Sequence, residues 1–284
     1  MIRKLVLATT LTIVLIGMLT STFNIQPVKA TNGITYIYIR AEGNVDPPDA
    51  PISSSDNVTY YITSDIVNKT IVVERDNITI DGNDFTLYGS EELDTVGIKL
   101  HNRTNVTIKN TSIAKYNLGI DVYNCSKIIL DENNASYNKI FVFIDPLMYY
   151  WTGAGISIFR SRDIVLSNNN VTNNISGIGI SSCNNTLVVR NNASNNREVE
   201  DSTYVGGGIS LYDSRNCTFV DNVISSNGAT GISIVSGVGY SSCNNTIRNN
   251  TITGAFGTSY GIAISESRNN TIAENTILSN TYGI

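Results

Sequence analysis

Short alternations of apolar and polar residues recur along this chain, and each is bounded by Asn, Ser and Gly. In the last unit of the pattern, Ile262 and Ile264 alternate with small residues, and the single isoleucines Ile272 and Ile277 each follow a Thr. Alternation over four or five residues between turn-forming residues is typical of a β-strand. Each unit therefore predicts three short strands separated by three turns.

The dipeptide Gly-Ile marks the same phase of every unit. Its glycines are Gly97, Gly119, Gly155, Gly177, Gly208, Gly231, Gly261 and Gly283. The shorter intervals are 22 or 23 residues, and the longer ones fit the same unit with a loop inserted. The segments between strands are too short for a crossover helix, so each strand has to pair with its equivalent one unit later. The pattern predicts an all-β parallel β-helix with three strands and about 22 residues per coil.

Stacked coils place equivalent residues above one another, about 4.8 Å apart. We therefore expect two inward-facing columns of aliphatic side chains along the first strand of each coil. The first column is Ile98, Ile120, Ile156, Ile178, Ile209, Ile232 and Ile262, and the second is Leu100, Val122, Ile158, Ile180, Leu211, Ile234 and Ile264.

Asparagine recurs at two fixed places in the unit, and the hexapeptide SSCNNT occurs twice, at Ser181–Thr186 and Ser241–Thr246. Asn tolerates left-handed backbone, and its amide can hydrogen-bond along a stack, so we expect corners at these places. The register after the second strand holds Asn133, Asn169, Asn191, Asn222, Asn250 and Asn275; the register after the third holds Asn138, Asn174, Asn196, Asn227 and Asn280.

Residues 1–30 are typical of a signal peptide. Arg3 and Lys4 precede an apolar run from Leu5 to Leu19, and cleavage after Ala30 suits a signal peptidase. A retained membrane anchor is the alternative, although the run is short for a bilayer span. With either alternative, the remainder of the chain lies outside the cytoplasm, secreted or at the cell surface.

The remaining chain divides into a cap and a solenoid. Residues 31–69 contain three prolines and precede the regular strands, so we expect an N-terminal cap there and the β-helix over residues 70–284. The sequence stops at Ile284 just as a new coil opens. Because an open apolar end would aggregate, we expect further coils or a capping domain after residue 284.

Composition limits the partners. The formal net charge is −5, only 15% of residues are charged, and no basic run is present, which argues against nucleic acid. We expect membrane contact only through the signal or anchor segment. Carbohydrate or components of the cell envelope are the partners that we expect.

Repeats such as NCTFVDNVISSNGATGI and NNTIAENTILSNTYGI resemble the right-handed parallel β-helix proteins of the NosD and carbohydrate-binding/sugar-hydrolase (CASH) type. The segment TYIYIRAEGNVDPPDAPI is similar to the entry segment of exported archaeal surface members. The resemblance implies right-handed coiling and, for NosD, a copper-linked role. The chain departs from that role, because His101 is its one histidine and no Cys, His and Met cluster is spaced to bind a metal. We therefore expect no metal and no cofactor.

Two insertions carry the candidate ligand-binding residues. They span about Tyr137 to Ala154 and about Asn195 to Gly206, and both leave from the same corner, two coils apart. Aromatic rings opposite charged side chains could form a sugar-binding cleft; simple packing of the two loops is the alternative. The candidates are Tyr149, Tyr150, Trp151, Arg197, Glu198, Glu200, Asp201 and Tyr204.

Cysteines, sequons and acids complete the candidates. We expect Cys183, Cys217 and Cys243 at one corner of successive coils, as a thiol ladder or with one disulfide; a soft-metal site is the less favoured alternative. The candidate glycosylation sites, taken from the Asn-x-Ser/Thr sequons, are Asn57, Asn102, Asn184, Asn216 and Asn244. Six acids stand apart from one another, and we expect them on solvated outer faces rather than in a catalytic pair: Asp121, Asp131, Glu132, Asp163, Asp213 and Asp221.

The leading function is non-enzymatic, an exported cell-surface scaffold that is structural or binds carbohydrate. The first alternative is a polysaccharide-acting enzyme, a lyase or hydrolase, with its site between the two insertions. The second is a NosD-like copper-accessory protein. The fold cannot choose among them, because enzymes and structural proteins share it.

Overall fold

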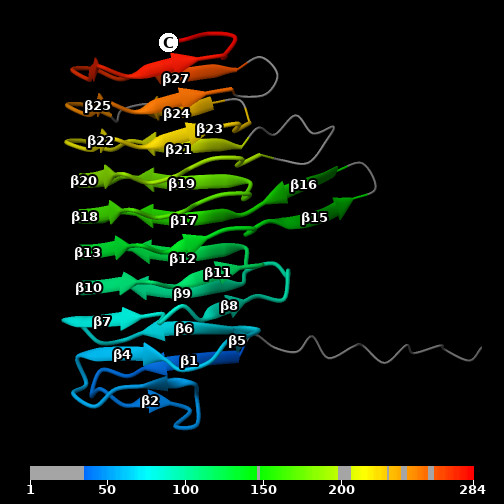
Figure 1. The fold of residues 1–284 in the computed structure, drawn as a ribbon, viewed down its shortest axis with the longest axis vertical. Coiled ribbons are helices and arrows are strands. Elements are labelled where there is room, and N and C mark those ends of the chain that lie inside the picture. The colour runs from blue at the N-terminus through cyan, green and yellow to red at the C-terminus, as the bar shows by residue number, and fades with distance from the viewer. Residues whose placement is uncertain (1–34, 146–147, 198–205, 229, 238–241, 255–258) are drawn as a thin grey trace, which may run out of the picture. The chain divides into compact units, whose positions relative to one another are not determined.

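The computed structural model describes residues 35–145, 148–197, 206–228, 230–237, 242–254 and 259–284. All of them belong to one structural unit, residues Ile34–Ile284. Most strands pair in parallel with their equivalents one coil away, so the chain winds into a stack of coils (Figure 1). This is the all-β parallel β-helix that the repeat predicts. None of the described residues forms a helix long and apolar enough to cross a membrane, and the expected signal peptide lies outside them.

Three parallel sheets run along the stack. Sheet A contains β2 (Val45–Asp46), β1 (Thr35–Ile39), β6 (Lys69–Val73), β9 (Val96–His101), β12 (Leu118–Tyr123), β17 (Ala154–Phe159), β19 (Ser176–Ser181), β21 (Gly207–Tyr212), β24 (Thr230–Val235) and β27 (Tyr260–Ser265). Sheet B contains β3 (Ile52–Ser53), β4 (Thr59–Ile62), β7 (Ile78–Asp81), β10 (Thr104–Lys109), β13 (Ser126–Asp131), β18 (Arg162–Ser167), β20 (Asn184–Val189), β22 (Thr218–Val220), β25 (Thr246–Arg248) and β28 (Thr271–Ala273).

Sheet C is built from two runs of shorter strands. The first run contains β5 (Ile66–Val67), β8 (Thr86–Tyr88), β11 (Ser112–Ala114) and β14 (Asn134–Ala135), and the second contains β23 (Val223–Ser225), β26 (Thr251–Thr253) and β29 (Thr276–Leu278). A chain of single bridges continues the pairing between the two runs: Asn134 with Asn170, Asn170 with Asn192, and Asn192 with Val223.

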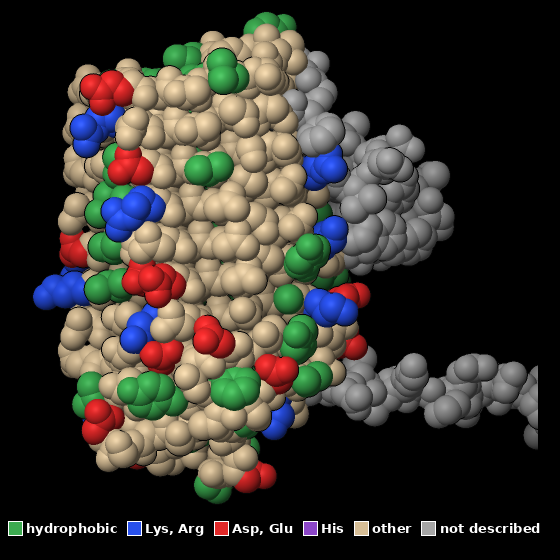
Figure 2. Space-filling view, in the orientation of Figure 1, with side chains coloured by type: hydrophobic (Ala, Val, Ile, Leu, Met, Phe, Trp, Pro, Cys, Tyr) green, Lys and Arg blue, Asp and Glu red, His purple; other side chains and the backbone are tan. Residues whose placement is uncertain are grey.

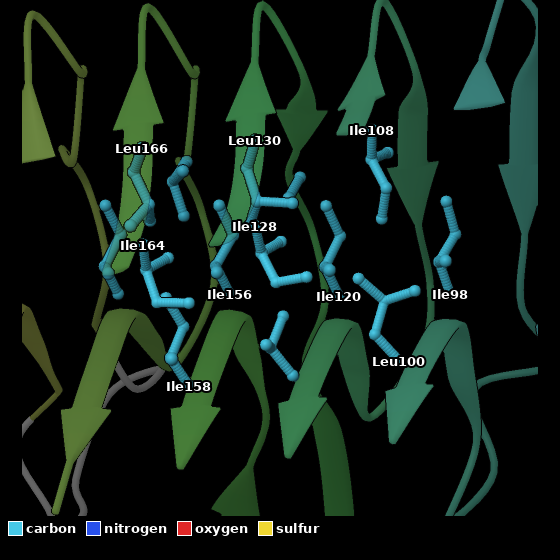
Figure 3. Close-up of a cluster of buried hydrophobic side chains, with 14 of the residues drawn as sticks. Ile98, Leu100, Ile108, Ile120, Ile128, Leu130, Ile156, Ile158, Ile164 and Leu166 are labelled. Carbon is cyan, nitrogen blue, oxygen red and sulfur yellow. The ribbon is translucent and has the colours of Figure 1, made fainter. Parts of the chain in front are cut away.

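The two aliphatic columns predicted from the sequence are confirmed. Ile98 pairs with Ile120 and Ile120 with Ile156, and the register continues to β27. Members of both columns are buried, apart from Ile264 in β27, which is 40% exposed. In Figure 3 side chains from sheet A face those from sheet B, such as Ile128, across the interior. Burying each such side chain stabilises the fold by about 1.5–3 kcal/mol.

The first coil begins earlier than the expected boundary at residue 70. Strands β1, β4 and β5 already pair in parallel with β6, β7 and β8, so residues 35–67 supply a complete coil. The short strands β2 and β3 pair antiparallel with β1 and β4 at the end of sheets A and B. These two strands therefore cover the edge that parallel pairing would leave open.

Both asparagine registers form ladders, as predicted, and all their members are buried except the last of each, Asn275 and Asn280. In the corner between sheets B and C, the Nδ2 of each ladder residue from Asn133 to Asn250 donates to the Oδ1 of the next, at 2.9–3.1 Å. The same Nδ2 atoms also donate to main-chain carbonyls, for example from Asn191 to Leu166 at 2.9 Å. The second ladder, at the corner from sheet C to sheet A, repeats this between Asn174 and Asn196 at 3.1 Å.

The left-handed backbone lies one residue earlier than we expected. Residues that precede ladder asparagines have positive φ, for example Glu132 at 55°, Arg190 at 53° and Asp221 at 58°. The ladder asparagines are not among the positive-φ residues. The corner thus divides its tasks between two neighbours, one that turns the backbone and one whose amide satisfies buried main-chain groups.

The corner from sheet A to sheet B uses hydroxyls and thiols as well as amides. The main-chain N–H of Cys125 donates to Ser161 Oγ at 3.0 Å, and that of Cys183 donates to Ser214 Oγ at 2.9 Å. Between them, the N–H of Ser161 contacts Cys183 Sγ at 3.5 Å. Cys183 therefore takes the place of a serine in this ladder.

The insertion after Asn138 contains an antiparallel hairpin. Strands β15 (Ile140–Asp145) and β16 (Met148–Thr152) pair with each other and project from the stack just before β17 (Figure 1). The insertion therefore adds a separate element without interrupting the register of the coils below and above it.

Replacing Asn191 with Ala should lower the apparent free energy of unfolding by about 3 kcal/mol. The change leaves the main-chain N–H of Asn169 and the carbonyl of Leu166 without these partners, and each unsatisfied buried group costs about 1–3 kcal/mol. Denaturant unfolding followed by circular dichroism measures it. The control is Asn184→Ala at an exposed asparagine, which should change stability by less than about 0.5 kcal/mol. Equal losses in the two variants would contradict a special role for the ladder.

Burial raises the pKa of the Cys183 thiol to about 12, so this thiol stays protonated at pH 8. We expect a thiol-specific reagent to modify the partly exposed Cys243 in the folded protein and Cys183 only after unfolding in guanidinium. Peptide mass spectrometry at pH 8 locates the modified residues. Modification of Cys183 in the folded protein as fast as Cys243 would contradict its burial in the ladder.

Candidate functional site

The outward side chains of sheet A gather the chemically distinctive residues. Alternation along each strand turns the inward columns to the core and leaves the last residue of β9, β12, β17, β19 and β21 facing out. Parallel pairing places these residues in one row. In order along the stack they are His101, Tyr123, Phe159, Ser181 and Tyr212.

Three rings of this row touch in sequence. The ring centroids of His101 and Tyr123 are 5.2 Å apart, and those of Tyr123 and Phe159 are 5.7 Å apart. The guanidinium carbon of Arg160 lies 5.0 Å from the centre of the Phe159 ring, a cation–π arrangement. Most of the face drawn in Figure 2 is backbone and uncharged polar side chains.

A depression of about 260 Å³ interrupts the aromatic row. Its floor is Gly179 and Ser181 of β19, and the rings of Phe159 and Tyr212 stand at its two ends, one coil to either side. A Cβ added to Gly179 would meet no atom within 4 Å. The hollow exists because one coil carries small side chains between two coils that carry rings.

A His–Asp pair lies at the other end of the row. His101 Nε2 is 2.7 Å from Asp121 Oδ2, and the Asp121 side chain is only 17% exposed. Lys99 pairs in register with Asp121 and also faces outward, and Tyr123 packs beside the imidazole. Two neighbouring strands thus present an imidazole, a carboxylate, an amine and a phenol on one open face. A carboxylate that holds an imidazole in place is a common arrangement for proton transfer.

This pair corrects our expectation for Asp121, which is not an isolated solvated acid. The signal was present in the sequence, because His101 and Tyr123 are 22 residues apart, one full coil. Other acids of the set accept hydrogen bonds from neighbouring side chains. Asp131, for example, accepts hydrogen bonds from Ser167 and Asn168, and Asp221 accepts one from Asn249.

A second hollow, of about 350 Å³, lies at the corner from sheet A to sheet B and spans the same three coils. Each coil contributes the residues that directly follow its part of the first depression. Its lining is Arg160, Ser161, Arg162, Ser182, Cys183, Asn184, Asp213 and Arg215. The two hollows therefore follow one another around the edge of sheet A.

The structure describes only part of the insertion residues. Glu198, Glu200, Asp201 and Tyr204 lie outside the described residues, and Arg197 is described and exposed. Tyr149, Tyr150 and Trp151 belong to β16, whose backbone is placed but whose side chains are not described. A cleft between the insertions stays a prediction.

The three cysteines are not brought into one ladder. Cys183 aligns with Ser161 and Ser214, the N–H of Cys217 donates to Asn245 Oδ1 at 2.9 Å, and Cys243 pairs with Arg215 and Arg268. All are free thiols.

The five candidate sequon asparagines are exposed. Two of them bond to each other, since Asn216 Nδ2 donates to Asn184 Oδ1 at 2.8 Å. Among the described residues, no three His, Cys, Asp or Glu side chains are placed to hold a metal ion.

The comparisons with known proteins agree on the fold. Residues 69–242 match the family model described as the right-handed beta helix region. No curated protein matches the sequence significantly. Two solved structures of the periplasmic alginate epimerase AlgG, both mutants, are 15% identical: the single mutant has a TM-score of 0.53 over 86% of this chain and 69% of that one, and the double mutant 0.50 over 75% and 50%.

An alginate lyase from Paenibacillus sp. str. FPU-7 is also similar, at 15% identity and a TM-score of 0.49, over 77% of this chain and 76% of that one. The chain spans half the length of the double mutant. At such identities the likeness concerns the fold alone, whereas the family model covers more than half of the sequence. The chain belongs to the right-handed β-helix family.

Proposed function

We propose that this protein is an exported β-helix protein that binds carbohydrate along the outer face of sheet A. The observation that carries the proposal is the depression floored by Gly179 and ended by the rings of Phe159 and Tyr212. Flat rings with apolar faces suit the C–H faces of sugars, and a shallow trough with a few polar groups suits an extended ligand.

The dimensions of the row fit a polymer rather than a single sugar. From His101 to Tyr212 the row crosses four coil steps of about 4.8 Å, or roughly 19 Å. Serine hydroxyls of Ser157 and Ser210 flank the floor and offer hydrogen bonds to sugar hydroxyls. A glycan strand lying along the stack, across the β-strands, would meet rings and hydroxyls in turn.

Export is part of the proposal. The N-terminal apolar run behind Arg3 and Lys4 supports it, and AlgG, whose fold this chain shares, is named as a periplasmic protein that acts on alginate. An extracytoplasmic location also gives a glycan-binding face access to polysaccharides of the cell envelope.

Filling the depression should abolish binding without disturbing the fold. In Gly179→Leu the new side chain enters open space, so the thermal midpoint should stay unchanged while affinity for the glycan that an oligosaccharide array selects falls at least tenfold. Isothermal titration calorimetry measures the affinity, and circular dichroism measures the midpoint.

The matched control is Ser233→Leu. Ser233 is the equivalent outward residue two coils from Gly179, outside the depression. We expect less than a twofold change in affinity there. If both variants bind as the unmodified chain does, the depression is not the binding site.

A second candidate function rests on the His101–Asp121 pair. An enzyme that acts on the bound polysaccharide, a lyase or hydrolase, could use His101 to move a proton while Asp121 holds the ring in place. The ring contacts from His101 through Tyr123 to Phe159 would join this pair to the binding trough. This site differs from the one we expected between the insertions.

If the chain cleaves a bound polysaccharide, Asp121→Asn should lower the turnover at least 100-fold and leave binding within about threefold, because acid–base groups contribute about 10²–10⁴ to rates. Release of reducing or unsaturated ends measures turnover. Asp221→Asn, at an exposed acid that follows β22, is the control and should retain full turnover. Lack of cleavage by the unmodified chain would reject the enzyme and leave binding as the function.

A further inference from the structure

The corner hollow concentrates positive charge in a chain that is acidic overall. Three arginines line it, Arg160, Arg162 and Arg215, against one carboxylate, Asp213. The whole chain has a net charge of −5 and only 19 Lys and Arg residues in 284. Three arginines at one corner of three coils therefore need an explanation beyond solubility.

These arginines form few ion pairs with neighbouring acids among the described residues. No ion pair within the described part of the chain involves Arg160 or Arg215, and Arg162 Nε is 3.8 Å from Asp163 in a pair whose side chains are 70% and 41% exposed. Such exposed pairs contribute little. Asp163 is also held by Asn185, whose Nδ2 donates to it at 2.6 Å.

The one carboxylate in the lining is directed to a main-chain donor. Asp213 Oδ1 accepts a hydrogen bond of 2.7 Å from the N–H of Gly237. Its charge therefore has a partner of its own, and the hollow keeps a surplus of guanidinium donors.

The strand register places Arg162 and Arg215 on either side of the coil that carries Asn184. Arg162 pairs with Asn184, and Asn184 pairs with Arg215, so the arginines are two coil steps apart, about 10 Å between their backbones. The coil between them carries Ser182, Cys183 and Asn184, which leave room above the floor. Guanidinium groups on either side of such a gap match the oxygens of a carboxylate or sulfate by bidentate hydrogen bonds.

The corner hollow adjoins the depression floored by Gly179 and Ser181, which is the trough proposed to bind the sugar. Phe159 is followed by Arg160, Ser181 by Ser182, and Tyr212 by Asp213, so in each coil the lining of one hollow continues directly into the lining of the other. Arg160 also packs over the Phe159 ring and its Nη1 lies 3.4 Å from the hydroxyl of Tyr123. A sugar in the trough would direct substituents on one side into the arginine hollow.

We propose that the hollow lined by Arg160, Arg162 and Arg215 binds the anionic group, carboxylate or sulfate, of a glycan that lies in the adjoining trough. The ligand of this protein is then an acidic polysaccharide. The inference rests on the proposed carbohydrate-binding function and gives its substrate class.

The test uses two pairs of polymers that differ in charge on the same backbone. Polygalacturonate and its methyl ester test a carboxylate, and dextran sulfate and dextran test a sulfate. We expect at least one acidic polymer to bind tenfold more tightly than its neutral partner at 50 mM salt and to weaken at 500 mM salt. The polymer that binds identifies the anion.

The double variant Arg162→Gln/Arg215→Gln should weaken binding of that acidic polymer at least tenfold. The control double variant, Arg190→Gln/Arg248→Gln, removes the same charge from two exposed positions outside the hollow, one directly after β20 and one at the end of β25, and should change binding less than threefold. Unchanged thermal midpoints in both verify that they fold.

Three results would overturn the anion site: equal weakening in both double variants, equal binding of acidic and neutral partners, or no binding of either acidic polymer. Two other results separate the anion site from the proposed sugar-binding trough. If Gly179→Leu leaves acidic binding intact while the Arg162/Arg215 variant loses it, the corner binds an anion but the trough does not bind the sugar. If Gly179→Leu loses binding and the arginine variant does not, the trough binds the sugar and the corner hollow does not bind its anionic group.

Discussion

The corners of this β-helix have to satisfy their buried main-chain groups through the next coil, and the rest of the structure depends on that hydrogen bonding. The amide of Asn191 accepts from the coil on one side and donates to the coil on the other as well as to a main-chain carbonyl. A shift of register by one residue would move every such amide out of its ladder and turn the aliphatic columns outward. The ladders therefore fix both where each strand begins and which side chains face the solvent.

Once the interior is fixed, the outer face is free to vary from coil to coil. Nothing in the packing of β19 demands a large side chain at Gly179 or Ser181, and nothing in β17 forbids a ring at Phe159. The hollows arise from this freedom rather than from loops. Backbone and uncharged polar side chains cover most of the face drawn in Figure 2, and on such a surface a few rings and arginines suffice to distinguish one part.

The repeat made the interior readable from the sequence. Ile98 and Ile120 are one period apart, and so are Asn169 and Asn191, which is why the columns and corners could be predicted residue by residue. The cysteines were harder, because coils with inserted loops shift the count: Cys217 looks equivalent to Cys183 by rough spacing but aligns with Asn245.

The outer site was missed for a different reason. A hollow depends on side-chain sizes in three coils at once, and a pattern within one coil contains no trace of it. The His101–Asp121 pair was within reach, since the period itself brings β9 beside β12. The insertions are visible in the sequence because they interrupt the repeat, whereas the described hollows are formed by residues within the regular coils.

The spacing of the coils has a consequence for how such a surface can change. Phe159 and Tyr212 are held two coil steps apart by the main-chain hydrogen bonds of β17, β19 and β21, so their separation cannot be adjusted by fractions of an ångström. Duplicating or deleting one coil would widen or close the trough by a whole step and leave every ladder intact. The width of a binding site on this scaffold can therefore change only in steps of one coil, and its evolution would proceed by gain or loss of whole coils.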